Sequence, residues 1–266
     1  MKTEDAMAQQ TALHPVERPD LPEKPGALHG QVWLTVHTRL AQNLIHGREG
    51  TAEKPTIIGL VGFANRMRVV WLAARRDDPY ADWWLIKVHE AIQFAENLIR
   101  NQHAVLSTQL NALPAMEVNI AESRKPYRVP LRFANPYAYR GARLIADLDK
   151  LVCMAMTARH IALLSTREYE HLVTGSARKI RAIFVIPQHY RLLKIDRETV
   201  RRQIGRSGEA RQVMGVVPED ILSGKRQAPI APRKISLPSN LPGHVGLHSK
   251  PSSRPKTVSE PETPLW

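Results

Sequence analysis

The longest regular pattern in the sequence is an apolar stripe at helical spacing that follows Asn135 and Pro136. Asparagine is a favoured N-cap, and proline has the backbone angle that the first helical position needs. The apolar positions of the stripe are Ala138, Ala142, Ile145, Leu148, Val152, Ala155, Ile161 and Ala162. The pattern predicts a long helix with one buried face, and therefore a fold built mainly from helices.

Two further apolar stretches predict long helices upstream of this stripe. Residues 55–76 are apolar on nearly all sides of a helix, which is typical of a central core helix. Residues 77–79 (DDP) form a turn and N-cap signal, and one apolar face follows from Trp84 to Leu106. We therefore expect several long helices to pack around a shared core.

Local start and stop signals predict the remaining helices. Ser165 and Glu168 have the spacing of a capping box, with Gly175 as an expected break in the helix that follows. Pro187 is expected to end that segment, because proline removes a helical hydrogen bond. Asp196 is positioned to cap a short last helix.

Three short segments have the alternation of a half-buried strand instead. They are residues 31–37, 116–121 and 128–133, the second and third separated by a polar turn. The sequence therefore predicts a mainly α fold with a short β-ribbon, of the α+β class.

The chain has 38 Lys and Arg against 25 Asp and Glu, which gives a net charge of +13 and a pI near 10.2. Residues 1–30 are slightly acidic, so the basic excess lies downstream. Proline-rich composition without an apolar period predicts a disordered arm over residues 1–28. We expect one helical DNA-binding and dimerisation domain over residues 29–210, followed by a basic, Pro- and Ser-rich disordered tail over residues 211–266.

Motifs for catalysis or nucleotide binding are missing from the sequence. Cys153 is the only cysteine, so neither an internal disulfide nor a cysteine zinc cluster can form. The sequence also lacks a P-loop, a dinucleotide-binding glycine motif, a nucleophile elbow and an HExxH motif. We therefore predict a protein that is not an enzyme and needs no cofactor.

Acidic residues at two places have a catalytic and a structural interpretation. One set could surround a metal ion, and it consists of Asp77, Asp78, Asp82, His89 and Glu90. Carboxylates at the start of a helix also interact favourably with the helix dipole, which is the structural interpretation. Asp147 and Asp149 lie two residues apart on a predicted helix, so they point in different directions and make a poor acid/base pair. The structural interpretation is favoured for both.

The N-terminal 26 residues are polar and proline-rich where a signal peptide would be apolar. No segment approaches the ~18 to 20 consecutive apolar residues of a membrane span. We expect a cytoplasmic protein without a membrane partner.

Basic side chains gather on two of the predicted helices. Arg178 lies with Lys179 and Arg181 on one helix, and Arg201 and Arg202 share a turn of another. Such groups would contact DNA phosphates strongly and without regard to base sequence. The alternative is that they form an ordinary solvated helix surface.

Sequence-specific contacts need an element that fits a groove, and a two-stranded ribbon does so. Thr35 and His37 lie on the polar face of the first predicted strand, and Arg39 follows it. Trp33 on the same face is an unusual residue to aim at a groove. Thr35, His37 and Arg39 are therefore candidate DNA contacts.

The last predicted strand is the second candidate. Arg128 and Arg132 share one face of it, Lys125 precedes it, and arginine suits both guanine edges and phosphates. Pro130 within the strand lacks the N–H that a central ladder needs. For both strands the alternative is that they pair within one subunit and never enter a groove.

Short motifs in the chain are similar to those of a known family. They are LTVHTRLAQ at 34–42, DDPYADW at 77–83, and NPYAY at 135–139 through TARHIAL at 157–163. Over roughly residues 30–205 the chain resembles the AcaB-like transcriptional regulators encoded by integrating conjugative elements and related conjugative plasmids.

That resemblance implies control of conjugative-transfer genes and supplies no catalytic residues. It also implies a ribbon-helix-helix-like core with extra helices, in which two subunits pair one strand each to form a homodimer. The leading hypothesis is a regulator that recognises double-stranded DNA through a β-ribbon. The alternative is a non-catalytic accessory protein that binds other conjugation proteins and contacts DNA nonspecifically.

Overall fold

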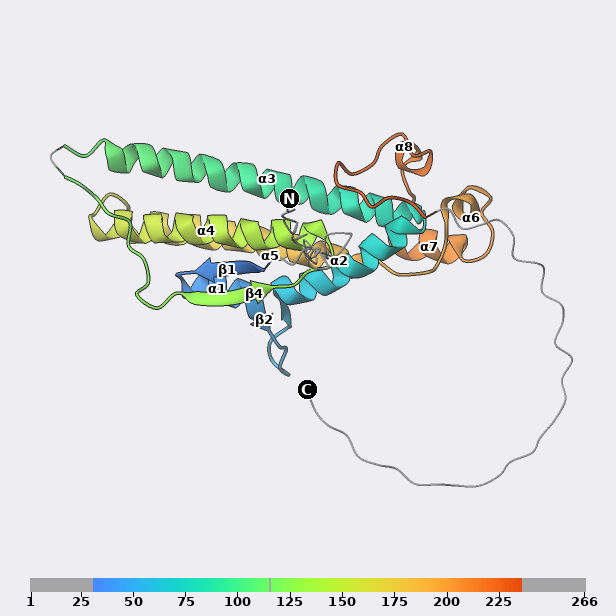
Figure 1. The fold of residues 1–266 in the computed structure, drawn as a ribbon, viewed down its shortest axis with the longest axis horizontal. Coiled ribbons are helices and arrows are strands. Elements are labelled where there is room, and N and C mark those ends of the chain that lie inside the picture. Colours follow the sequence, from blue (N-terminus) through green and yellow to red (C-terminus); the bar gives the residue numbers. More distant parts are fainter. Residues whose placement is uncertain (1–30, 115, 236–266) are drawn as a thin grey trace, which may run out of the picture. The chain divides into compact units, whose positions relative to one another are not determined.

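The computed structural model describes residues 31–114 and 116–235, which form mainly helices with two small antiparallel sheets (Figure 1). The mainly helical α+β class predicted from the sequence is confirmed. The described residues divide into two units, which comprise residues 31–65 with 91–185 and residues 66–90 with 186–235. Helices α2 (Leu60–Arg75) and α3 (Pro79–Asn111) each contribute residues to both units.

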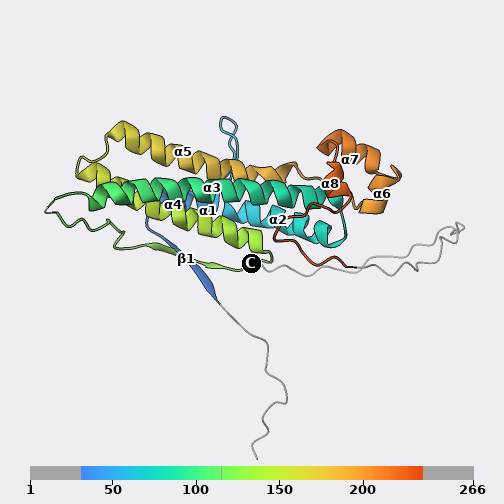
Figure 2. The ribbon, with the colours of Figure 1, turned by 90° about the horizontal axis from the view of Figure 1, so that it is seen from above.

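The first unit is a helical layer that supports a short β-ribbon. In addition to parts of α2 and α3, it contains β1 (Val32–Val36), α1 (Arg39–His46), β2 (Gly47–Arg48), β3 (Ile57–Ile58), β4 (Tyr127–Leu131), α4 (Pro136–His160) and α5 (Thr166–Val185). Both views show the second half of α3 beside α4 and α5 (Figures 1 and 2). Helix α4 contacts α5, α1 and β1, so it forms the centre of this core.

Helix α4 begins where the sequence predicts it. The Asn135 side chain accepts a hydrogen bond from the Ala138 N–H at 2.9 Å, and Pro136 is the first helical residue. Gly141 on α4 faces Phe63, and a Cβ there would lie 3.0 Å from the Phe63 ring. Close packing against α2 therefore favours glycine at this position.

The predicted capping box of α5 is also present. Glu168 Oε2 accepts hydrogen bonds from the Ser165 N–H at 2.8 Å and the Ser165 hydroxyl at 2.6 Å. The expected break at Gly175 is wrong, because α5 continues through it to Val185. Gly175 faces open space, so only its modest helix propensity cost of about 1 kcal/mol opposes the helix.

Two other sequence predictions in this unit are wrong. The helix expected from residue 55 begins only at Leu60, because Ile57 and Ile58 pair with Arg48 and Gly47 in the β2–β3 sheet. A Cβ on Gly59 would lie 2.3 Å from the backbone nitrogen of Gly47, so this close approach requires glycine. Residues 116–121 do not form the expected strand, and the Ala121 N–H instead donates to the Thr157 hydroxyl at 2.9 Å.

The second unit consists of short helices around the start of α3. It adds η1 (Ile186–His189), α6 (Arg197–Arg201), α7 (Ser207–Met214) and α8 (Glu219–Leu222). The tail expected from residue 211 therefore starts too early, because Met214, Val217 and Ile221 bury apolar side chains. The predicted arm over residues 1–28 and the remainder of the predicted tail, residues 236–266, lie outside the described residues.

The helices in the described part of the chain do not combine the length and apolar character needed to cross a bilayer.

Candidate nucleic-acid interface

Strands β1 and β4 pair with each other in an antiparallel ribbon whose two faces differ in polarity. Leu34 and Val36 of β1 are buried, and so is Leu131 of β4, so one face joins the core. Because side chains alternate along a strand, the opposite face carries Trp33 and Thr35 of β1 and the exposed residues Arg128 and Pro130 of β4. The ribbon that the sequence predicts is thus formed within one chain.

The outward face of the ribbon carries Trp33, Thr35, Arg128 and Pro130, and we call this set the outer ribbon face. Thr35 lies opposite Arg128 and Trp33 lies opposite Pro130. The Arg128 guanidinium lies 4.5 Å from the centre of the Trp33 ring, in a cation–π contact that leaves Trp33 43% exposed. Trp33 therefore serves as a platform that orients Arg128, and Pro130 is tolerated because both strands of a two-stranded sheet are edges.

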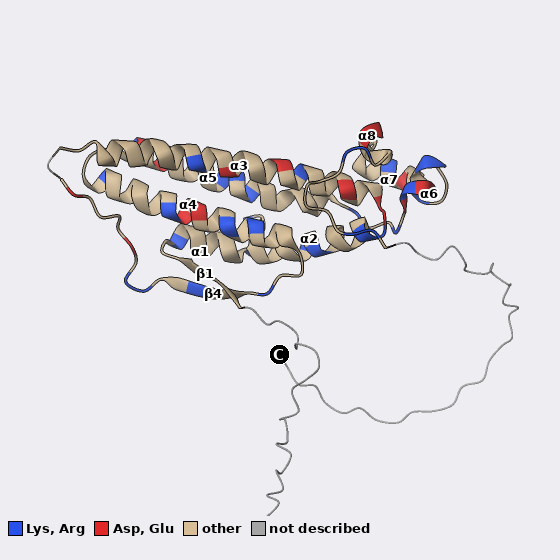
Figure 3. Cartoon of the chain, turned by 45° about the horizontal axis from the view of Figure 1, so that its top comes forward, with Lys and Arg blue, Asp and Glu red and all other residues tan. Residues whose placement is uncertain are grey.

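Further basic residues flank the outer ribbon face. Lys125 is exposed just before β4, and its N–H donates to the Ser123 hydroxyl at 3.2 Å. Arg132 is exposed directly after β4. Figure 3 shows Lys and Arg positions on β4 and on the segment that leads into it. The structure therefore places Thr35, Lys125, Arg128 and Arg132 along one exposed ribbon and its approaches.

Asp149 of α4 fixes the junction between β1 and α1. Its buried carboxylate accepts hydrogen bonds from the His37 N–H at 2.6 Å, the Thr38 N–H at 2.9 Å and the Thr38 hydroxyl at 2.6 Å. Thr38 in turn caps α1 by accepting from the Ala41 N–H at 3.2 Å. Asp149 is a positioning residue whose contacts with His37 and Thr38 were not predicted from the sequence. The threonine N-cap before a short helix was the available signal.

His37 is half-buried and already has a structural contact. Its Nδ1 accepts a hydrogen bond from the Ser123 N–H at 3.2 Å. That contact ties the segment before β4 to the end of β1. His37 therefore has a structural role, because its hydrogen bond positions the segment that carries Lys125.

The other basic candidates lie outside β1 and β4. Arg39 is exposed at the first residue of α1, and Arg178 is exposed on α5 of the same unit. Arg201 and Arg202 belong to the second unit. Arg201 donates to the Leu222 carbonyl at 3.3 Å, and Arg202 pairs with Glu198 at 2.6 Å on the helix surface.

A family model described as transcriptional regulator AcaB matches residues 24–234. The chain belongs to the AcaB family. A search of curated proteins found no match. Among solved structures, selenomethionine-containing AcaB from uropathogenic E. coli matches with 14% identity and a TM-score of 0.49, over 74% of this chain and 95% of that chain.

The family resemblance stated from the sequence is thereby confirmed, and with it the assignment to a family of transcriptional regulators. The matched region includes the β1–β4 ribbon and nearly all described residues of the second unit, so both belong to the AcaB-family part of the chain.

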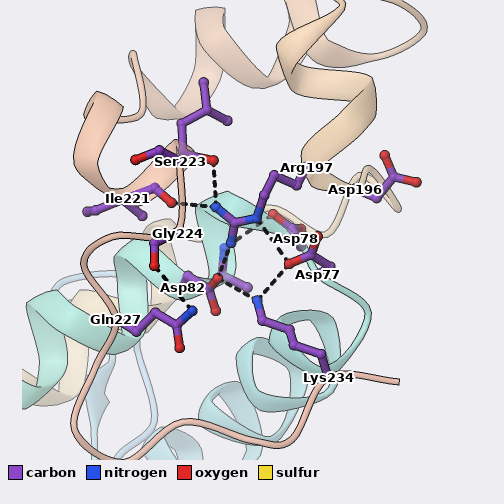
Figure 4. Close-up of polar contacts among 12 residues, drawn as sticks. Asp77, Asp78, Asp82, Asp196, Arg197, Ile221, Ser223, Gly224, Gln227 and Lys234 are labelled. Atoms are coloured by element: carbon purple, nitrogen blue, oxygen red, sulfur yellow. Dashed lines mark hydrogen bonds and ion pairs between the residues drawn. The ribbon is translucent and has the colours of Figure 1, made fainter. Parts of the chain in front are cut away.

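The second unit of this AcaB-family chain is organised around a buried arginine (Figure 4). Arg197 of α6 pairs with Asp82 at 2.6 Å and with Asp77 at 3.1 Å, and donates to the Leu222 carbonyl at 2.7 Å and to the Ile221 carbonyl. Lys234 reaches the same two carboxylates at 2.6 and 2.8 Å. The start of α3, the start of α6 and residues 221–234 are therefore held together by one charge cluster.

This cluster leaves no metal site at the carboxylates considered above. Asp77 and Asp82 are neutralised by Arg197 and Lys234, while Glu90 pairs with Arg226. Asp78 caps α3, because its Oδ1 accepts from the Tyr80 N–H at 2.8 Å and from the Ala81 N–H at 3.2 Å. Within residues 31–114 and 116–235, no His, Cys, Asp and Glu group has the arrangement of a metal site.

Cys153 of α4 is a free, buried thiol. Burial first, and then the charges of Asp149 and Glu122, raise the pKa of its thiol to about 11. The group is therefore a neutral thiol near neutral pH, and only the thiolate is a strong nucleophile.

Asp78 is expected to make the stability of the second unit depend on pH. Burial raises the pKa of its carboxyl to about 6, although hydrogen bonds from Tyr190, Ala81 and Tyr80 oppose the shift. Because the folded pKa exceeds the unfolded value, the stability from this group is complete below about pH 4 and is lost as the pH rises through 6. As the pH rises from 4 to 7, the free energy of unfolding of Asp78→Asn should increase by about 2 kcal/mol relative to that of the wild type. Urea denaturation at each pH measures this difference.

Asp196→Asn is the control with the opposite sign. The backbone N–H and the hydroxyl of Thr199 lower the pKa of the Asp196 carboxyl, so its stabilising effect is present at neutral pH and lost in acid. The Asp196→Asn variant should therefore lose stability relative to wild type as the pH rises. An identical pH dependence in both variants would contradict the assignment to Asp78.

Proposed function

We propose that this chain regulates the transcription of conjugative-transfer genes by binding duplex DNA through the outer ribbon face. Membership in a family of transcriptional regulators supports a role at DNA. The observation that carries the proposal is the exposed ribbon itself, on which Arg128 is oriented by Trp33 and lies opposite Thr35.

The chemistry of the outer ribbon face suits the major groove. A two-stranded ribbon fits the width of that groove, and arginine donates two hydrogen bonds to guanine O6 and N7. Thr35 offers a hydroxyl and a methyl group beside it. Lys125 and Arg132 at the two ends of β4 are placed to contact phosphates, which set the position of the protein but do not read sequence.

A homodimer is part of the proposal, since two ribbons would read two half-sites. The order β1, α1 and α2 supports a relation to ribbon-helix-helix proteins, although β2 and β3 separate the two helices. In the described residues β1 pairs with β4 of its own chain. A second copy would therefore add to the opposite edge of the ribbon, or dimerise elsewhere.

Arg128→Gln is expected to weaken binding to element promoter DNA by about tenfold or more at moderate salt. The reason is that a bidentate arginine–guanine contact contributes about 1–3 kcal/mol of discrimination. Mobility shifts with promoter and scrambled duplexes, repeated at increasing salt, measure the effect. Binding to scrambled DNA should change much less.

Arg143→Gln is the matched control, because Arg143 is an exposed arginine of α4 that has the same charge and lies outside the outer ribbon face. It should keep the promoter preference and lose only nonspecific affinity. Equal losses for Arg128→Gln and Arg143→Gln, or no promoter preference at any salt, would reject sequence reading by the ribbon.

The alternative, an accessory protein that binds other conjugation proteins, is favoured by exposed apolar residues on α3. Phe94 and Val105 are 62% and 60% exposed and lie eleven residues apart, which places them on one helix face. Deletion of residues 236–266 distinguishes the two functions and leaves the Lys234 cluster intact. If promoter binding survives the deletion, the ribbon proposal stands; if all DNA binding is lost, the accessory role gains.

A further inference from the structure

The second unit contains a cavity of about 270 Å³ that the proposed DNA interface does not use. The polar residues of its lining include Gln203, Ser207 and Arg211, and Gly208 also lines it. The apolar residues of its lining include Val200 and Val217. A cavity with a few converging polar groups in apolar walls is the usual form of a small-molecule site.

Ser207 is the first observation that points to a ligand. Ser207 is among the residues that line the cavity, it is only 6% exposed, and its Oγ has no hydrogen-bond partner among the described residues. A buried hydroxyl without a partner destabilises the folded state, so such groups need an explanation. A ligand that accepts its hydrogen bond would supply one.

The N-terminus of the eight-residue helix α7 opens into the same cavity. Its N-cap, Arg206, makes no side-chain cap hydrogen bond and instead pairs with Glu209 at 2.8 Å. The N–H groups of Gly208 and Glu209 have no acceptor in the described part of the chain. Free N–H groups at a helix start, together with the helix dipole, favour an anion.

Arg211 adds a full positive charge to the lining of the cavity. It follows Ser207 by four residues on α7, so the two side chains share one helix face. No ion-pair partner for Arg211 occurs among the described residues, whereas Arg206 of the same helix has one. A hydroxyl, backbone N–H groups and a guanidinium without an ion-pair partner thus belong to one helix whose start lines the cavity.

We propose that this cavity binds a small organic anion, with its phosphate or carboxylate group at Ser207, Gly208 and Arg211 and its apolar part against Val200 and Val217. A phosphate of the DNA backbone could also be the bound anion, but an apolar cavity wall suits a free small molecule better than a phosphodiester. The chain would then be a regulator with a ligand site separate from its ribbon.

The test is an NMR titration of the ¹⁵N-labelled full chain at constant ionic strength. The probes are inorganic phosphate, phenyl phosphate and a DNA duplex, with potassium chloride as the reference. We expect the Gly208 amide signal to shift saturably with both small anions, and phenyl phosphate to bind more tightly because its ring covers apolar wall. A response to the duplex alone, or to neither small anion, would overturn the proposal.

Three variants distinguish a specific anion-binding site from nonspecific electrostatic attraction of anions. Ser207→Ala and Arg211→Gln should each weaken phenyl phosphate binding about tenfold, the expected effect of losing one hydrogen bond to a charged group. Ser207→Ala should also raise the melting temperature of the ligand-free chain, because it removes the unpartnered hydroxyl. Arg191→Gln removes an exposed charge of the same unit and should change neither. Equal weakening by Arg191→Gln would reduce the site to nonspecific attraction and refute the proposal.

Discussion

Asp149→Ala is expected to lower the free energy of unfolding by about 3–5 kcal/mol and to abolish promoter binding. The buried carboxylate is the acceptor for two backbone N–H groups and one hydroxyl at the β1–α1 junction. Without it, the donors of His37 and Thr38 lose their partner and β1 loses its fixed position on α4. Urea denaturation measures the stability loss, and mobility shifts measure the DNA binding.

Asp147→Ala provides the matched control on the same helix. The Asp147 side chain is 39% exposed, and its ion pair with Arg143 is long at 4.0 Å. Its removal should change the free energy of unfolding by no more than about 0.5 kcal/mol. Equal costs for the two substitutions, or normal promoter binding by a folded Asp149→Ala variant, would show that Asp149 does not position the ribbon.

Helix starts that have a capping side chain were predictable from the sequence because their signals are local. Asn135, Ser165 with Glu168, and Asp196 each accept hydrogen bonds from N–H groups within three residues, as their spacing predicts. A cap needs only a few consecutive residues to form. The structure therefore agrees with the sequence at each of these positions.

Strand pairing was less predictable because it depends on distant partners. Residues 32–36 pair with residues 127–131, which lie far away in the chain, and periodicity alone does not identify a partner. Residues 116–121 have the alternation of a strand but pair with no other strand of the described chain. The sequence thus revealed the polar faces of both ribbon strands but left open which strands join.

The site residues also divide into those predictable from local sequence and those that depend on distant contacts. Exposure of Thr35, Arg128 and Arg132 follows from alternation, which the sequence displays. His37 accepts a hydrogen bond from Ser123, and Asp149 holds the β1–α1 junction. Both are tertiary contacts between segments that lie far apart in sequence. No local pattern separates a supporting polar residue of this kind from an exposed one.

Arg197→Ala is expected to lower the free energy of unfolding by about 3–5 kcal/mol, because it leaves buried carboxylates and carbonyls without their partner. Arg197 is 8% exposed and Asp82 is 3% exposed, so water does not replace the lost contacts. Burial raises the pKa of Asp82 even though Lys234 and Arg197 lie beside it and oppose the shift. Because the pair is buried, high salt should alter the loss very little.

Arg202→Ala, five residues later, is the control for this prediction. Its ion pair with Glu198 is exposed on both sides, so its loss should cost about 0–0.5 kcal/mol and vary with salt. Urea denaturation of both variants at low and high salt measures the contrast. Since Arg197 joins α6 to the start of α3 and to the backbone at Ile221 and Leu222, its loss should also increase amide hydrogen exchange across residues 219–235. Wild-type exchange in that segment would mean that the cluster does not hold it in place.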